Sequence, residues 1–292
     1  MPKVSRNAII GSLLLLPAAV LLWVFTYQPI VTTFISSLYS TPRGRRPSVF
    51  VGLDQYQTMI NDPVFWKGMW NNLLYAAATI PLSMVLALAM ALLVNSKLRG
   101  QSIVRMAFFT PTILPMVAVA NIWLYFYAPD YGLVDIVLSR FGMGGNNFLG
   151  MPETALAALV IITVWKEAGF FMIFYLAALQ QISPSMLEAA DLEGAGPWQK
   201  LRRVILPLLM PTTLFVSINA VIGAFRMVDH VVAMTKGAPD NATMLLLFYI
   251  YQNGFNYWDT GYAAALTMVL LFILALIALF QFGYVDKRIH YR

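Results

Sequence analysis

Long apolar runs without charge constrain this chain more than any other feature. No Asp, Glu, Lys or Arg occurs between Arg6 and Arg43, and similar runs follow along the chain. A helix of roughly 20 apolar residues crosses the hydrocarbon core of a bilayer. Of the 292 residues, 60% are hydrophobic and only 11% are charged, far less charge than soluble domains carry. The sequence therefore predicts an all-α polytopic membrane protein.

Six runs are long enough to span a bilayer. The spans are expected at about residues 9–33, 70–95, 106–128, 154–180, 205–228 and 260–284. Pro111 and Pro115 lie in the third run and predict a bent helix. The first run follows Lys3 and Arg6 as in a signal peptide, but its length and the lack of a small-residue cleavage site favour a retained anchor. No linker or low-complexity segment interrupts residues 1–292, which predicts a single transmembrane domain.

Six spans place both termini on the same side of the membrane. Cytoplasmic loops are enriched in Lys and Arg. With both termini in the cytoplasm, eleven Lys and Arg residues fall on the inside and six on the outside. Arg43, Arg45 and Arg46 weaken this bias without reversing it. The loop between the fourth and fifth spans is therefore expected in the cytoplasm, and the net charge of +6 is assigned to membrane-rim cations rather than to nucleic-acid binding.

That loop, residues 183–203, is polar and has a defined layout. Ser183-Pro184 is a helix-start signal, because Ser can cap free N–H groups and Pro suits the first turn. Gly194 and Gly196 are expected to end or bend the helix, and Pro197 to begin a second one. The simplest alternative is an ordinary connector with caps and snorkelling cations.

The spacing inside this loop carries a resemblance. Glu188-Ala189-Ala190, three residues, Gly194, nine residues, Val204, one residue and Leu206-Pro207 resemble the coupling-loop signature of bacterial ATP-binding-cassette importer permeases. Val204 stands where that family usually has Ile. The resemblance implies docking to a cytoplasmic ATPase, with Glu188 contacting an ATPase cation and Ala189, Ala190 and Gly194 allowing a close fit.

Other segments extend the resemblance over nearly the whole chain. They resemble the maltose and glycerol-3-phosphate branch of carbohydrate permeases: Phe50-Val51-Gly52-Leu53-Asp54-Gln55-Tyr56, Thr235-Lys236-Gly237-Ala238-Pro239 with Asn241-Ala242-Thr243, Tyr249-Ile250-Tyr251, and Phe282-x-Tyr284-Val285. Ala238 replaces a Gly of the family pattern. The resemblance implies one permease domain over residues 1–292, in the bacterial cytoplasmic (inner) membrane.

The resemblance also implies partners. They are a second homologous permease subunit, two cytoplasmic ATP-binding-cassette ATPase subunits and an extracytoplasmic solute-binding protein. The chain has no G-x-x-x-x-G-K-[ST] run, so ATP and Mg are expected on the ATPase subunits, with no cofactor here and no enzyme activity in this chain. With no Cys and only two His, neither a thiolate nor a His-based metal centre is expected.

Family members of the maltose type contact solute from the spans on either side of the coupling loop. The matching residues here are Glu167, Phe170, Phe171, Asn219, Ala220, Gly223, Arg226 and Met227. Ionisable groups inside a membrane are costly and usually face a partner or a water-filled path. Lys166 with Glu167, and Arg226 with Asp229 three residues on along a helix, are such groups. The alternative is that each pair is a structural ion pair.

These observations together predict a permease subunit that imports a sugar, glycoside or polyol derivative. The solute is expected to be anionic if Arg226 or Lys166 faces the path. One alternative is an ion-coupled secondary transporter of a small polar solute. Another is a membrane-embedded enzyme, against which the sequence offers no His-Glu-x-x-His run, no G-x-S-x-G run and no paired midplane carboxylates.

Overall fold

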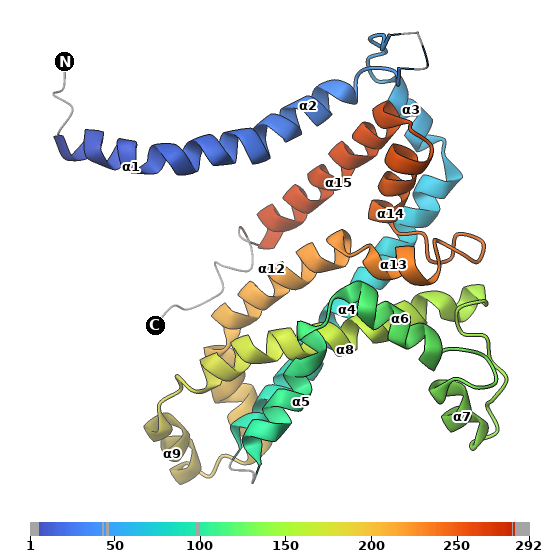
Figure 1. Ribbon diagram of the computed structural model, residues 1–292. Helices are drawn as coiled ribbons and strands as arrows, with labels where there is room; N and C mark the ends of the chain where they lie inside the picture. Colours follow the sequence, from blue (N-terminus) through green and yellow to red (C-terminus); the bar gives the residue numbers. More distant parts are fainter. Residues whose placement is uncertain (1–5, 43, 45–46, 97–99, 282, 284–292) are drawn as a thin grey trace. The chain divides into compact units, whose positions relative to one another are not determined.

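The computed structural model describes residues 6–42, 44, 47–96, 100–281 and 283. These residues form helices and connecting turns, with one isolated β-bridge between Tyr39 and Phe50. Among them, five helices are long and apolar enough to cross a membrane, or six if one bent pair counts as a single span. The predicted all-α polytopic class is confirmed (Figure 1).

The chain divides into two compact units. One combines Met1–Asp62 with Ile250–Phe272, and the other combines Pro63–Tyr249 with Ile273–Arg292. The first unit opens with an apolar helical run made of α1 (Arg6–Leu22), η1 (Trp23–Tyr27) and α2 (Gln28–Ser36). None of its most apolar stretch is buried inside the structure. A helix that is apolar all round needs lipid or a protein partner to cover it.

The rest of the first unit ties the loop after α2 to the start of the last helix. Its elements are α3 (Asp54–Ile60), η3 (Gln252–Asn256) and the first part of α15 (Thr260–Phe280). The Gly261 N–H donates to Thr41 Oγ1 at 2.9 Å. The Tyr262 hydroxyl donates to the Asp62 carboxylate at 2.6 Å. Both bonds join segments that are distant in the sequence.

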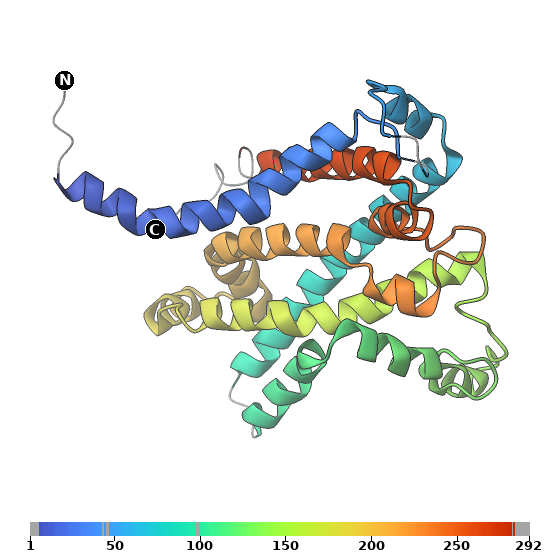
Figure 2. The same ribbon diagram turned by 45° about the horizontal axis from the view of Figure 1, so that its top comes forward.

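The second unit holds the remaining helices. They are α4 (Pro63–Asn95), α5 (Gln101–Ile113), α6 (Met116–Phe126), α7 (Leu133–Ser139), α8 (Pro152–Leu179), α9 (Pro184–Leu192), α10 (Pro197–Lys200), η2 (Leu201–Ile205), α11 (Leu206–Leu208), α12 (Met210–Arg226) and α13 (Asp229–Met234), with α14 (Leu246–Tyr251) at the boundary between units. The long helices α4 and α8 cross in contact, and α12 packs against both (Figures 1 and 2).

Small residues allow the helices of the second unit to approach closely. Ala87 and Ala91 of α4 and Ala168 of α8 are fully buried in one apolar core cluster. Gly169 of α8 faces α5, where an added Cβ would lie 3.0 Å from Thr112 Oγ1. Small residues at crossings are typical of membrane helices, whose association depends on close packing. The crossing of α4 and α8 therefore forms the base on which the site is built.

The structure corrects some predicted helix limits. The third span is bent as predicted, but it breaks into two helices. The chain bends by 102° between α5, which ends at Ile113, and α6, which begins at Met116 after Pro115. Helix α4 begins at Pro63, so Lys67 lies inside the helix rather than ahead of it. Residues 282 and 284–285 of the predicted Phe-x-Tyr-Val segment lie outside the described residues.

The helix of the fifth span breaks near its predicted end, although the span itself runs on to Met234. Helix α12 stops at Arg226, Met227 has an extended backbone (φ −82°, ψ 111°), and α13 starts at Asp229. The prediction that Arg226 and Asp229 lie one turn apart on a common helix is therefore wrong. The break at Met227 places them on two different helices.

Candidate functional site

The predicted coupling loop forms two short helices separated by a turn. We refer to residues 184–200, which comprise α9, the glycine turn and α10, as the coupling segment. Pro184 occupies the first turn of α9 as predicted. Ser183 occupies the N-cap position as predicted, but its hydroxyl makes no bond to the free N–H groups and instead lies 2.7 Å from the Ser185 hydroxyl. In Figure 1, α9 lies just beyond the end of α8.

Backbone hydrogen bonds close the end of α9 in a Schellman motif. Gly194 has φ +77°, a left-handed conformation that Gly adopts at little cost. Its N–H donates to the Asp191 carbonyl at 3.0 Å, and the Ala195 N–H donates to the Ala190 carbonyl at 2.9 Å. The predicted helix end at Gly194 is confirmed. The shape of the turn thus depends mainly on the backbone.

A salt bridge joins the two helices of the coupling segment across this turn. Lys200 Nζ lies 2.6 Å from the Asp191 carboxylate. Both side chains are partly exposed, and surface pairs contribute only about 0–1 kcal/mol. The Gly196 N–H also donates to the Gln199 side chain at 3.2 Å. These contacts orient α10 relative to α9 more than they stabilise the fold.

The coupling segment presents a mixed outer face. Glu188 and Ala189 are exposed, whereas Ala190 is only 7% exposed and faces the interior of the chain. Leu192 is 91% exposed and Trp198 is 68% exposed. Reasoning from the sequence missed Leu192, although a large apolar residue in a polar helix outside the membrane was an available signal. Exposed apolar groups beside a carboxylate form a surface suited to a protein partner.

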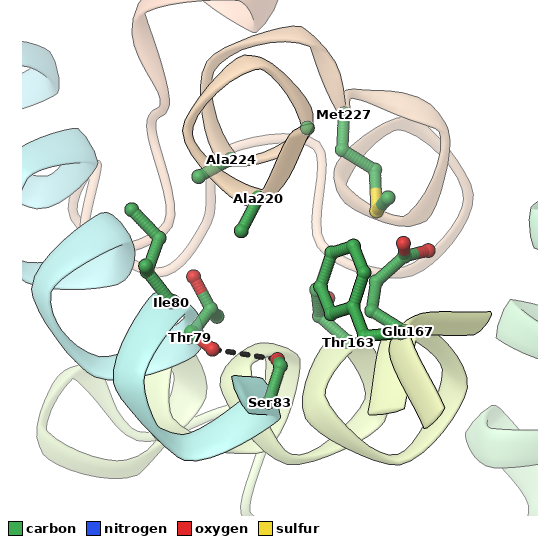
Figure 3. A pocket seen from close by; sticks show the side chains of 10 residues that line it. Thr79, Ile80, Ser83, Thr163, Glu167, Ala220, Ala224 and Met227 are labelled. Carbon is green, nitrogen blue, oxygen red and sulfur yellow. Dashed lines mark hydrogen bonds between the residues drawn. The ribbon is translucent and has the colours of Figure 1, made fainter. Parts of the chain in front are cut away.

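A small cavity lies between α4, α8 and α12 (Figure 3). It is lined by Thr79, Ile80 and Ser83 of α4, by Thr163, Glu167 and Phe171 of α8, and by Ala220, Gly223, Ala224 and Met227 from α12 and the break after it. Its volume is about 20 Å³. A single water needs at least about 10–15 Å³ by this measure. The cavity therefore admits a water-sized molecule but is too small for a sugar.

The structure brings five of the eight predicted path residues to this cavity. They are Glu167, Phe171, Ala220, Gly223 and Met227. In Figure 3 the Glu167 carboxylate lies beside the Met227 side chain. Gly223 has nothing within 4 Å of the position that a Cβ would occupy. This wall thus combines one carboxylate, one aromatic ring and open space.

The other three predicted path residues lie elsewhere. Phe170 packs edge-to-face on Phe174, with ring centroids 5.1 Å apart. The Asn219 amide donates to the Phe215 carbonyl of its own helix at 2.8 Å. Arg226 is exposed at the end of α12. None of the three is among the residues that line the cavity.

Three hydroxyl residues of the cavity were missed from the sequence. The Ser83 hydroxyl donates to the Thr79 carbonyl at 2.6 Å, and the Thr79 hydroxyl donates to the Tyr75 carbonyl at 2.7 Å (Figure 3 shows the first). Thr163 is the third. A signal was present in span 2, where Asn72, Tyr75, Thr79 and Ser83 recur every three or four residues and share one helix face.

Lys166 and Glu167 point in different directions. Lys166 is buried, and its Nζ donates to the Thr112 carbonyl of α5 at 3.1 Å, while Glu167 lines the cavity. Adjacent residues on a helix do not face each other. Lys166 therefore joins α8 to α5, and Glu167 is the charged residue that the described cavity presents.

Comparison with known proteins identifies the family. Residues 79–291 match the family described as "Binding-protein-dependent transport system inner membrane component". The chain belongs to this family. It is 34% identical over 265 residues to the sulfoquinovosyl glycerol transport system permease protein SmoG of Agrobacterium fabrum, covering 90% of this chain and 86% of that one. It is 33% identical over 278 residues to the lactose transport system permease protein LacF of Rhizobium radiobacter, covering 93% and 92%.

Solved structures agree on the fold. A bacterial ABC transporter involved in the import of the acidic polysaccharide alginate superposes with a TM-score of 0.83 at 23% identity, covering 97% of this chain and 96% of that one. The same kind of alginate transporter, solved in complex with an alginate pentasaccharide-bound periplasmic protein, gives a TM-score of 0.82 at 23% identity, covering 94% and 93%. At this identity the likeness supports the fold alone.

The family assignment confirms the central prediction from the sequence. The chain is a multi-pass inner membrane permease of an ABC importer of the carbohydrate-uptake family, and it is the permease component rather than the ATPase. The alternatives of a secondary transporter and a membrane-embedded enzyme are left without support.

Proposed function

We propose that this permease imports a sugar, glycoside or polyol derivative, and that residues 1–292 act as one permease domain. The relatives named above are permeases for lactose and for sulfoquinovosyl glycerol, which supports a carbohydrate-derived solute. The observation that carries the role of an ATPase-coupled permease is the coupling segment, a helix-turn-helix with an exposed Glu188 and a Leu192 that is 91% exposed. Such a surface transmits movement only when a partner binds it.

The proposed complex contains four kinds of subunit. This chain pairs with a second homologous permease, and two cytoplasmic ATPase subunits, which hold ATP and Mg, dock on the coupling segments. An extracytoplasmic binding protein delivers the solute, and both termini of this chain lie in the cytoplasm. The small cavity supports this arrangement, because about 20 Å³ leaves no room for a sugar unless a second subunit or another conformation widens the path.

The predicted coupling residues have two different roles in this proposal. Glu188 and Ala189 are exposed and contact the ATPase, together with Leu192. Ala190 and Gly194 act indirectly, since their backbone groups close the Schellman motif that fixes the contact surface. Full burial of a Leu side chain contributes about 1.5–3 kcal/mol, so Leu192 adds substantially to docking.

The cavity wall supplies this subunit's share of the solute path. The Glu167 carboxylate accepts hydrogen bonds from solute hydroxyls, and Phe171 offers an apolar face beside it. Space for the solute is left by Ala220, Gly223 and Met227. When the path widens, the solute also contacts three residues beside the present cavity, namely Phe170, Asn219 and Arg226. Because a carboxylate repels anions, this wall favours a neutral solute, and an anionic one requires Arg226 to turn toward the path.

Affinity purification tests the proposed docking role of the coupling segment. The tagged chain is purified in detergent from its host and compared with Glu188→Lys and Leu192→Asp. The wild type is expected to bring down a soluble ATPase and a second permease, and both variants are expected to lose the ATPase but keep the permease. Glu153→Lys is the control. It makes the same charge change at the start of α8, whereas the coupling segment follows the end of α8, and it should keep both the ATPase and the second permease. Retention of the ATPase by both coupling variants would contradict the proposed docking surface.

A further inference from the structure

A cluster of three buried polar side chains lies next to the cavity and has no role in the proposal above. The Tyr75 hydroxyl of α4 is 2.6 Å from Thr163 Oγ1 of α8 and 3.0 Å from His230 Nε2 of α13. Tyr75 and His230 are fully buried, and their rings stack with centroids 5.7 Å apart. Three helices from distant parts of the sequence therefore meet at one hydroxyl group.

This cluster is physically continuous with the cavity. Thr163 belongs to both, because it lines the cavity and bonds to Tyr75. Met227, another lining residue, occupies the extended break between α12 and α13, and His230 follows it on the first turn of α13. A break between two helices is a place where backbone angles can change. The hydrogen bonds of His230 therefore fix the helix that begins at the edge of the cavity.

The Tyr75 hydroxyl takes part in both hydrogen bonds of the cluster. Tyr75 has one proton, so it donates either to His230 or to Thr163, and the other group donates to the Tyr75 oxygen. Thr163 is engaged in either arrangement. His230 Nδ1 is buried and has no hydrogen-bond partner among the described residues. An unpaired buried polar group lowers the stability of the state that contains it.

We propose that Tyr75, Thr163 and His230 form a latch that closes the α13 end of the solute path, with His230 as a positioning residue for transport. A solute hydroxyl that bonds to Thr163 competes with Tyr75 for it. Loss of the Tyr75–Thr163 bond weakens the hold on His230 and frees α13 to turn about Met227. This inference depends on the proposed path through the cavity.

Thiol labelling of the complete transporter in membrane vesicles tests the latch. The chain contains no Cys, so Met227→Cys provides the one reporter thiol of this subunit for a water-soluble maleimide. Phe141→Cys, at a position that is 73% exposed and lies outside the coupling segment, provides the labelling standard. Tyr75→Phe is expected to raise the labelling rate of the Met227→Cys reporter about fivefold, the effect of one typical hydrogen bond. His230→Asn should do the same, because its shorter amide cannot reach the Nε2 position, whereas His230→Gln can reach it and should label at the original rate.

A matched control separates the latch from a general loosening of the chain. Tyr262→Phe removes a buried hydroxyl that donates to Asp62 at 2.6 Å in the other compact unit, where neither residue lines the cavity, and should leave labelling unchanged. The latch is overturned if Tyr75→Phe and His230→Asn leave the rate unchanged, or if Tyr262→Phe raises it equally. Labelling requires no solute, so a raised rate without any sugar uptake would support the latch and count against the proposed substrate class alone.

Discussion

The coupling segment and the cavity are built in opposite ways. The coupling segment comes from consecutive residues, and backbone hydrogen bonds around Gly194 hold its shape. The cavity comes from three helices that are far apart in the sequence, and side-chain packing holds it. Leu192 is 91% exposed in the first region, whereas Ala220 is 6% exposed in the second. Substitutions in the coupling segment should therefore act on partner binding, and substitutions in the cavity should act on the movement of solute.

The largest expected effect in the coupling segment comes from Gly194→Val. A β-branched residue at φ +77° is strained by roughly 1–2 kcal/mol or more, so the turn rearranges and α10 loses its orientation. Binding of the ATPase, measured by titration of the purified permease pair, should weaken by at least about tenfold. The spans should remain folded, with the same elution volume in detergent.

Gly196→Val is the matched control for this prediction. Gly196 is exposed in the same turn but has φ −67° and ψ 167°, which any residue adopts, and nothing lies near its missing Cβ. Its variant should bind the ATPase nearly as the wild type does. Equal loss in both variants would mean that bulk, rather than the backbone motif, disrupts docking.

A smaller effect is expected from Lys200→Ala. This change removes the 2.6 Å bridge to Asp191, a surface pair of about 0.2–1 kcal/mol, so ATPase affinity should fall by roughly 1.5- to 5-fold at low salt. The difference should shrink at high salt, because ions screen exposed charges. Arg202→Ala removes a nearby exposed cation without breaking this bridge and is the control. A loss that persists unchanged in high salt would contradict an electrostatic origin of the effect.

The same contrast explains what the sequence could predict. Glu188, Gly194 and Pro197 are close in the sequence, and their signals are local, so the coupling segment was predicted almost completely. The exposure of Leu192 was not predicted, because it depends on the direction in which the helix face points. Ser183 is the N-cap residue as predicted, but its hydroxyl lies 2.7 Å from the Ser185 hydroxyl instead of bonding to the free N–H groups of the helix.

The cavity was predicted only in part. The resemblance to the family predicted lining residues on α8 and α12. It did not predict that Thr79 and Ser83 of α4 line the cavity, because their position there depends on how two long helices cross. That crossing is a tertiary property, set by small residues spread over both helices. The break at Met227 carries neither Pro nor Gly within the break itself, so no local signal separated Arg226 from Asp229.

One measurement tests the central claim that the cavity carries solute and the coupling segment transmits energy. Uptake and ATP hydrolysis are measured together on the reconstituted transporter for Gly223→Phe, with Gly223→Ala as the control. An added Cβ meets nothing within 4 Å at this position, so Gly223→Ala should assemble like the wild type, and assembly of Gly223→Phe is checked by its elution volume in detergent. Gly223→Phe should hydrolyse ATP at nearly the wild-type rate but import less than about a tenth as much solute, the loss that 1.4 kcal/mol or more would cause. Wild-type uptake by Gly223→Phe, or equal loss of uptake and hydrolysis, would contradict the account.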